Sequence, residues 1–179
     1  MNSITLVLGT ARAERSSEAV TTALQNAFTT KGVTVNFVDV KDHVKEAVTL
    51  PDWGVGGANE VPTRWQETVA SSTSFVFVLP EYNHGYPGEW KLLIDSLSKS
   101  AYAGKKAYTV AVSAGNFAGV RLADHVLPVY VELMLQPMPN RLYIGSVKNA
   151  LSTKGEVLDA SMQERIDAFV DTVLEESTL

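Results

Sequence analysis

The sequence of 179 residues contains no cysteine, and this absence removes several chemistries at once. Disulfides, zinc–thiolate sites, iron–sulfur clusters and thiolate nucleophiles are all excluded. A chain without cysteine is compatible with a reducing compartment, and we expect it in the cytoplasm.

Long basic runs and long apolar runs are also missing. The net charge is -5 and no stretch concentrates Lys and Arg, so nucleic acid is not expected as a partner. No apolar stretch approaches the roughly 20 residues that span a bilayer, so a membrane is not expected either. The apolar run at residues 4–8 is too short for a signal-peptide core and is better explained as a buried strand.

The composition that remains is typical of one folded domain covering residues 1–179. Hydrophobic residues make up 45% and charged residues 20%, which favours a compact globular protein over disorder. The three histidines, His43, His84 and His125, are scattered and form no serine–histidine–acid arrangement or metal-ligand spacing. We therefore predict no metal site and no catalytic side chain, with His43 and His125 at surface or structural positions.

Short apolar strands alternate with amphipathic helices along the chain. Strands are predicted at residues 4–8, 33–40, 75–79, 107–113 and 141–147, and helices near 19–28, 63–72, 88–100, 120–135 and 158–174. Residues 41–62, rich in polar residues and glycine, are predicted to form a long loop-rich connection. The alternation indicates βαβ units, and therefore a three-layer α/β doubly wound fold of the flavodoxin-like kind. Its five-stranded parallel sheet would have the order 2-1-3-4-5.

In such a sheet the ligand binds beyond the carboxyl ends of strands 1 and 3, so we look for ligand-binding residues in the loops that follow the strands. The first loop and helix start, residues 9–18, read GTARAERSSE. Free N–H groups at a helix start favour a phosphate, and the hydroxyls of Thr10, Ser16 and Ser17 would add donors. Arg12 and Arg15 would add charge-assisted contacts.

That loop lacks both the Gly-Lys-Ser/Thr of a P-loop and the Gly-x-Gly-x-x-Gly of a dinucleotide fold. One terminal phosphate therefore fits it better than a pyrophosphate. The alternative is that Ser16 or Ser17 only caps the helix while the arginines are solvated.

The second loop, residues 80–88, reads PEYNHGYPG and the third, residues 113–119, reads SAGNFAG. A flat ring needs an aromatic or apolar floor with polar edges, and Asn83 with its neighbouring backbone suits the uracil-like edge of a flavin. The small residues of the third loop would allow a ligand close to the backbone. The alternatives are a Pro/Gly turn with an aromatic plug and a tight strand–helix turn.

With these motifs the chain resembles the NADPH-dependent FMN reductase family of the flavodoxin-like superfamily. The first loop is similar to the family's Gly-Ser-x-Arg pattern followed by a serine. The most specific match is Pro80-Glu81-Tyr82-Asn83, then Pro87-Gly88, Lys91 and Ile94-Asp95. The chain departs from the family at Thr10, which replaces serine, and at Glu18, which stands where many relatives have a small polar residue.

The resemblance implies an FMN-binding enzyme that exchanges NADPH or NADH for a small acceptor in one open site, by a ping-pong mechanism. The acceptor would be a quinone, an azo compound, a metal oxyanion or free flavin, and the protein a homodimer or homotetramer. The bound flavin supplies the hydride chemistry. The cofactor-binding residues that this implies are Thr10, Arg12, Arg15, Ser17, Glu18, Pro80, Glu81, Tyr82, Asn83, His84, Ser113, Ala114, Gly115 and Asn116.

Two alternatives stay open at this point. A flavodoxin-like electron carrier would need a redox partner protein and would not oxidise nicotinamide by itself. A non-enzymatic flavin- or nucleotide-binding module would share the fold without the reaction.

Overall fold

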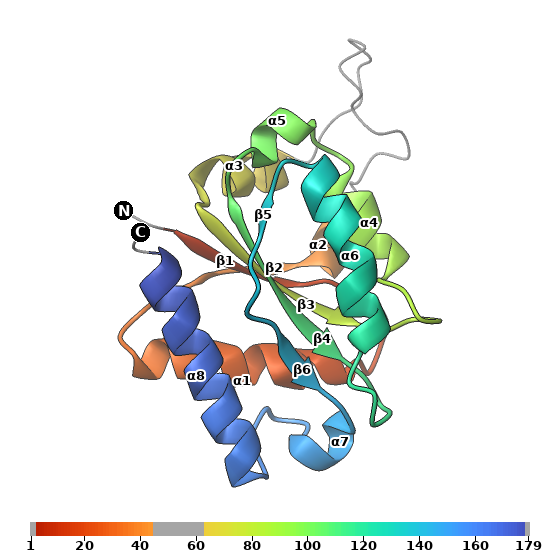
Figure 1. The fold of residues 1–179 in the computed structure, drawn as a ribbon, viewed down its shortest axis with the longest axis vertical. Coiled ribbons are helices and arrows are strands. Elements are labelled where there is room, and N and C mark those ends of the chain that lie inside the picture. Colours follow the sequence, from red (N-terminus) through yellow and green to blue (C-terminus); the bar gives the residue numbers. More distant parts are fainter. Residues whose placement is uncertain (1–2, 45–62, 178–179) are drawn as a thin grey trace.

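The computed structural model describes residues 3–44 and 63–177 (Figure 1). Its strands are β1 (Ile4–Leu8), β2 (Asn36–Asp39), β3 (Ser74–Pro80), β4 (Lys106–Val112), β5 (Gln136–Pro137) and β6 (Leu142–Ile144). Its helices are α1 (Ser16–Thr30), α2 (Val40–Val44), α3 (Thr63–Ser71), α4 (Gly88–Ile94), α5 (Lys99–Tyr102), α6 (Val120–Glu132), α7 (Val147–Ala150) and α8 (Ala160–Ser177).

All pairings between these strands are parallel, and the sheet order is β2-β1-β3-β4-β5 with β6 also paired to β4. This confirms the predicted order. The prediction of one fifth strand at 141–147 was wrong, because two short segments share that position. β5 pairs with the beginning of β4 and β6 with its end. Pro137 and Pro139 lack the N–H that a continuous ladder requires, which explains the interruption.

The central strands β1, β3 and β4 are buried on both faces because helices cover the sheet on both sides. All residues of β3 are buried, and their side chains alternate between two hydrophobic cores. Val76 and Val78 contribute to the core beneath α1 and α8, while Phe75 and Phe77 contribute to the core beneath α3, α4 and α6. Figure 1 shows the resulting three layers, which confirms the predicted architecture.

Three predicted elements have different limits. The strand expected at 33–40 is paired only from Asn36 to Asp39, and Val40 already begins α2. The helix expected at 88–100 is two short helices, because the hydroxyl of Ser96 bonds back to the carbonyl of Leu93 and the chain leaves helical geometry before α5. Of the connection predicted at 41–62, residues 41–44 form part of α2 and residues 45–62 lie outside the described part of the chain.

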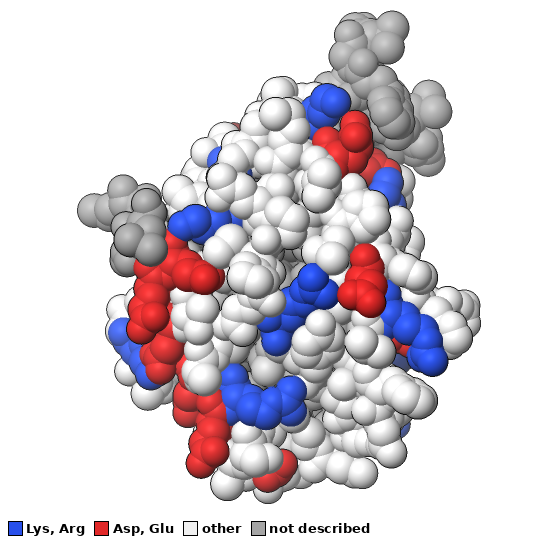
Figure 2. Space-filling model, viewed as in Figure 1, with Lys and Arg blue, Asp and Glu red and all other residues white. Residues whose placement is uncertain are grey.

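Helix α8 carries most of the net negative charge. Its five acidic side chains and one arginine lie on a surface that Figure 2 shows as a nearly continuous acidic strip at the left edge. Lys and Arg side chains are scattered on the same view. Among residues 3–44 and 63–177, no helix is both long and apolar enough to cross a bilayer.

Candidate functional site

Three loops begin at the same edge of the sheet, because β1, β3 and β4 are parallel neighbours. Loop 1 (residues 9–15) follows β1, loop 2 (residues 81–87) follows β3, and loop 3 (residues 113–119) follows β4. The N–H of Gly9 donates to the carbonyl of Val78 at 2.9 Å, and the N–H of Glu81 donates to the carbonyl of Val112 at 2.8 Å. The three loops therefore start next to one another at this edge of the sheet, as the predicted topology requires.

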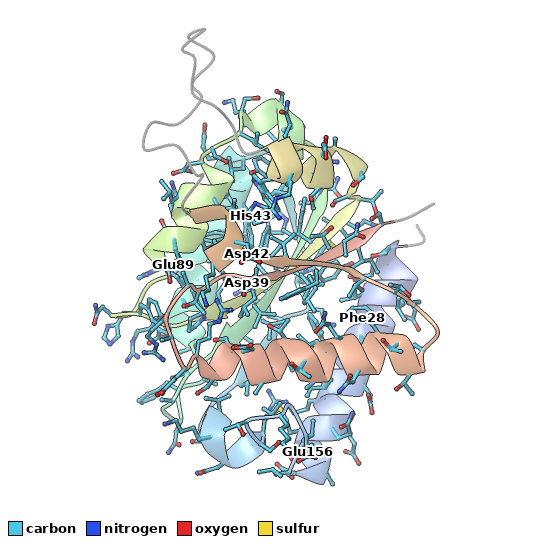
Figure 3. The ribbon with its side chains drawn as sticks, turned by 180° about the vertical axis from the view of Figure 1, so that it is seen from behind. Phe28, Asp39, Asp42, His43, Glu89 and Glu156 are labelled. Atoms are coloured by element: carbon cyan, nitrogen blue, oxygen red, sulfur yellow. The ribbon has the colours of Figure 1, made fainter. Side chains whose placement is uncertain are left out.

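Loop 1 is tied to loop 2 and to α4 through Thr10. The Thr10 side chain is buried, and its Oγ1 lies 2.5 Å from Tyr82 Oη and 3.1 Å from Glu89 Oε1. The Ala11 N–H donates to the same Glu89 oxygen at 2.9 Å. Loop 1 thus already holds an anionic group, a carboxylate that comes from α4. Figure 3, from behind, labels Glu89 on the same side of the molecule as Asp39 at the end of β2.

The two arginines of loop 1 have different surroundings. Arg12 is exposed, and its guanidinium lies over the Tyr82 ring, 5.5 Å from the ring centre. A stacked guanidinium keeps the N–H groups at its edge available to a phosphate. Arg12 therefore has the exposure and the donor set that the phosphate prediction requires.

Arg15, by contrast, is buried, with a side chain 6% exposed. Its Nη1 lies 2.8 Å from Asp39 Oδ1, its Nη2 bonds the other carboxylate oxygen, and Nη1 also donates to the Thr10 carbonyl. Burial lowers the pKa of Arg15, but the hydrogen bonds and charge of Asp39 more than offset this, so the pKa lies above its ordinary value. Arg15 joins loop 1 to the end of β2, and the alternative in which the arginines are solvated was wrong for this residue.

Helix α1 starts without a side-chain cap, so the capping alternative for the two serines was wrong. Arg15, with extended backbone, is the N-cap residue and Ser16 is the first helical residue. Ser17 is buried near the start of the helix. Glu18 is exposed, with its carboxylate 3.7 Å from Arg15 Nε, so it faces the buried ion pair.

Loop 2 is a tight turn directly after Pro80, the last residue of β3. Tyr82 and Gly85 exchange two backbone hydrogen bonds, each 2.9 Å long. Between them Asn83 and His84 have φ angles of 48° and 68°, and both side chains are exposed. Positive φ at both central positions defines a turn of type I′, in which asparagine is favoured. The turn thus presents Asn83, which the prediction assigned to the flavin edge, together with His84, another predicted cofactor-binding residue.

Glu81 fastens loop 2 to the start of α6. Its Oε2 accepts the Leu122 N–H at 3.4 Å, and its Oε1 lies 3.7 Å from Arg121 Nη1. A carboxylate at a helix N-terminus is a favourable arrangement. Glu81 therefore positions the loop, since its charge is directed at α6.

Loop 3 is held against the end of β6. The Ser113 hydroxyl accepts the Gly115 N–H at 3.0 Å, and Asn116 Oδ1 accepts the Ser146 hydroxyl at 2.6 Å. A Cβ on Gly145 would stand 3.0 Å from the Gly115 carbonyl, so glycine permits this close approach. Ala114, Gly115 and Asn116 are exposed on the loop. Beside them Phe117 is 70% exposed, with the Arg121 guanidinium 5.1 Å from its ring centre.

These donors fit the phosphate end of a mononucleotide. The hydroxyl of Thr10 and the N–H of Ala11 converge on a carboxylate oxygen, which demonstrates an anion-binding arrangement at the β1–α1 junction. The exposed Arg12 stands beside it. The exposed turns of loops 2 and 3 lie at the same sheet edge.

A doubly wound parallel sheet with an anion-holding first loop at its switch point defines a mononucleotide-binding protein of the flavodoxin-like class. Within that class the chain belongs to the NADPH-dependent FMN reductase family, whose model matches residues 2–149. The protein is accordingly an enzyme that uses FMN, takes electrons from NAD(P)H and passes them to a small acceptor.

Two curated relatives and two solved structures extend the comparison. A quinone reductase of Pseudomonas putida is 28% identical over 180 residues, covering 94% of this chain and 91% of the relative. A 2-hydroxy-1,4-benzoquinone reductase of a Burkholderia species is 24% identical over 118 residues, covering 63% of this chain and 64% of the relative. The flavoenzyme NAD(P)H:acceptor oxidoreductase FerB of Paracoccus denitrificans superposes with a TM-score of 0.76 at 21% identity, covering 98% of both chains. A flavodoxin of Streptococcus pneumoniae superposes with a TM-score of 0.61 at 12% identity, covering 97% of this chain and 98% of the flavodoxin.

Sequence reasoning missed two residues of this region, Asp39 and Glu89. Asp39 lies one residue before the end of the strand predicted at 33–40, next to the first strand, so its position at the same sheet edge was a usable signal. Glu89 follows Pro87 and Gly88 in the first turn of a helix, where an acidic residue is so common that it indicates nothing specific.

Two substitutions of Asn83 separate a contact with the flavin from a contribution to the turn. Asn83→Ala puts alanine, whose side chain cannot form a local hydrogen bond, at a φ of 48°. We expect this to lower the free energy of unfolding of the flavin-free protein by about 1 kcal/mol. Asn83→Gly tolerates that φ and removes the same amide. If the amide contacts the flavin, both variants weaken FMN binding alike while only Asn83→Ala lowers the melting temperature. Unchanged FMN affinity in Asn83→Gly would assign the residue to the turn alone.

Proposed function

We propose that the protein is an FMN-dependent NAD(P)H:quinone oxidoreductase. The observation that carries the flavin site is the convergence of Thr10 and Ala11 on an anion beside the exposed Arg12. The quinone is favoured because the Pseudomonas and Burkholderia relatives are named as quinone reductases. Bound FMN supplies the ring that accepts a hydride and passes electrons on.

The residues of the three loops have distinct roles in this proposal. Thr10, Ala11, Arg12 and Ser17 bind the phosphate. Loops 2 and 3 bind the ring through Tyr82, Asn83 and His84 and through the segment from Ser113 to Asn116. Arg15, Glu18, Pro80 and Glu81 support the site indirectly, because their contacts and positions hold the loops in place.

The test is a reaction of the FMN-loaded protein with NADH and with NADPH, in separate series against a quinone, an azo dye, a metal oxyanion and free flavin. We expect unaided nicotinamide oxidation, the highest kcat/KM with the quinone, and parallel double-reciprocal plots. Nicotinamide oxidation that requires a second redox protein would instead establish the electron carrier. The likeness to a flavodoxin concerns the fold and does not separate these outcomes.

A homodimer or homotetramer is part of the same proposal, and Trp90, beside the site, does not supply its surface. That side chain is fully buried in the monomer's own core, against Tyr86 and Phe77. Phe117, Val120, Val131 and Met134 are instead exposed apolar side chains on and beside α6. Val120 and Val131 are eleven residues apart, which puts them on one helix face. Exposed apolar side chains grouped at one helix are typical of a subunit contact.

We expect light scattering to report an oligomer at micromolar concentration, and Val131→Lys to shift it toward the monomer. Leu158→Lys is the matched control, because Leu158 is similarly exposed but lies before α8. A monomeric wild type, or equal dissociation by both variants, would contradict the α6 contact.

We also place the enzyme in the cytoplasm, where cells maintain reduced nicotinamide nucleotides. Cell fractionation with activity as the marker tests this placement.

A further inference from the structure

We propose that Glu89 is a built-in anion that opposes the FMN phosphate and sets the preference of the site between FMN and riboflavin. The proposal rests on the placement of the phosphate at loop 1 in the proposed function. It goes beyond that function, because it makes an acidic residue of α4 a determinant of cofactor affinity.

Glu89 occupies the donors that a phosphate needs. Its Oε1 accepts the Ala11 N–H at 2.9 Å and the Thr10 hydroxyl at 3.1 Å. A hydroxyl has one proton, so Thr10 has only acceptor positions left for the Tyr82 hydroxyl at 2.5 Å and the Arg12 N–H at 3.4 Å. A phosphate that binds Thr10 and Ala11 must therefore displace the Glu89 carboxylate from these two donors.

The position of Glu89 is fixed by the packing of α4. Trp90, the next residue, is fully buried, and a Cβ on Gly9 would lie 3.3 Å from its Cδ1. The side chain of Trp90 is thus packed against the start of loop 1, which holds the first turn of α4 beside that loop. Figure 3 shows Glu89 projecting from α4 on the side of the sheet edge where loop 1 begins.

The charge of Glu89 is not neutralised by the bonds that it accepts. Both of its donors, the Thr10 hydroxyl and the Ala11 N–H, are neutral groups. On the same helix, Lys91 is paired with Asp95. A phosphate monoester carries about 1.5 to 2 negative charges at pH 7, so a phosphate at loop 1 meets both charge repulsion and competition for donors.

Removing that charge should therefore tighten FMN binding. Glu89→Gln keeps the length and the acceptor oxygen of the side chain, and Glu89→Ala removes both the charge and the bonds. We expect each variant to bind FMN about tenfold more tightly than wild type, a change of about 1.4 kcal/mol. Riboflavin, which lacks the phosphate, should bind all three proteins with affinities within about twofold.

The experiment is titration calorimetry of the flavin-free proteins with FMN and with riboflavin. Glu14→Gln is the matched control: it removes one negative charge from an exposed position of loop 1, three residues after Ala11. We expect its FMN-to-riboflavin affinity ratio to stay within about twofold of wild type. Thermal melting of each flavin-free variant establishes that it is folded.

Equal or weaker FMN binding in Glu89→Gln and Glu89→Ala would overturn the proposal, and Glu89 would then be a brace for loop 1. If both flavins bound more tightly to the same extent, the phosphate would not be the group opposed, which also overturns it. If wild-type protein binds neither flavin, the proposed function itself is wrong. Tight FMN binding by wild type without the Glu89 effect rejects this inference alone.

Discussion

Asp39→Ala is expected to destabilise the flavin-free protein by about 3–5 kcal/mol, the largest loss we predict. Removing the carboxylate leaves the Arg15 guanidinium, whose side chain is 6% exposed, without its bidentate partner. The Glu18 carboxylate, 3.7 Å from Arg15 Nε, is 66% exposed and compensates the buried charge only in small part. The substitution also removes the acceptor of the Lys41 N–H, which bonds Asp39 Oδ1 at 2.9 Å. Urea denaturation of the flavin-free variant measures this loss.

Asp124→Ala provides the comparison, because Asp124 pairs with Arg141 at 3.3 Å but its own side chain is 70% exposed. We expect that change to cost less than about 1 kcal/mol. Adding Arg15→Met to Asp39→Ala should restore much of the lost stability, since both charges are then gone. If Asp39→Ala were no worse than Asp124→Ala, Arg15 would be free to reach water, and its assignment as the brace of loop 1 would be wrong.

Most of the fold could be predicted from the sequence, because the patterns that define its helices and strands lie within short stretches of the chain. Strand β3 is an apolar run with both faces buried, and the stripe of α1 has the helical period, so each could be recognised without knowing its neighbours. The interruption between β5 and β6 could not be recognised in this way. Both β5 and β6 pair with β4, but which residues pair depends on where the chain between Pro137 and Leu142 is placed against the sheet.

The site was predictable at the level of loops and less so at the level of side chains. Parallel order alone brings the three loops to one edge, which is why their convergence could be expected. Arg12 and Arg15 both stand in the polar first loop, three residues apart, yet one is exposed and the other is buried against Asp39. That difference arises from the position of β2 beside β1, a tertiary relation. The Glu89 contact is likewise tertiary, since it joins residues 78 positions apart.

Arg12→Ala is expected to weaken FMN binding by about 1.5–3 kcal/mol, roughly ten- to a hundredfold, and to leave riboflavin binding unchanged. Arg12 is the exposed arginine of loop 1, stacked 5.5 Å from the Tyr82 ring centre, and its guanidinium suits bidentate contact with a phosphate. Arg12→Lys keeps the charge but not the fork, so its loss should be smaller. Titration of the flavin-free variants with both flavins measures these affinities.

The ratio of FMN to riboflavin affinity separates a phosphate contact from a contribution of the stacked side chain to the ring. Arg121→Ala is the control, because Arg121 is also stacked on an aromatic side chain, Phe117, but follows loop 3. Arg121→Ala should change the affinities for FMN and riboflavin alike and leave their ratio within about twofold of wild type. If Arg12→Ala likewise lowered both affinities equally, Arg12 would act through the Tyr82 ring and not on the phosphate. We expect the ratio of FMN to riboflavin affinity to fall in Arg12→Ala and to rise in Glu89→Gln. Only a charged group at loop 1 responds to these two substitutions with opposite sign. Such a pair of results would place the phosphate between a cation and an anion of this chain.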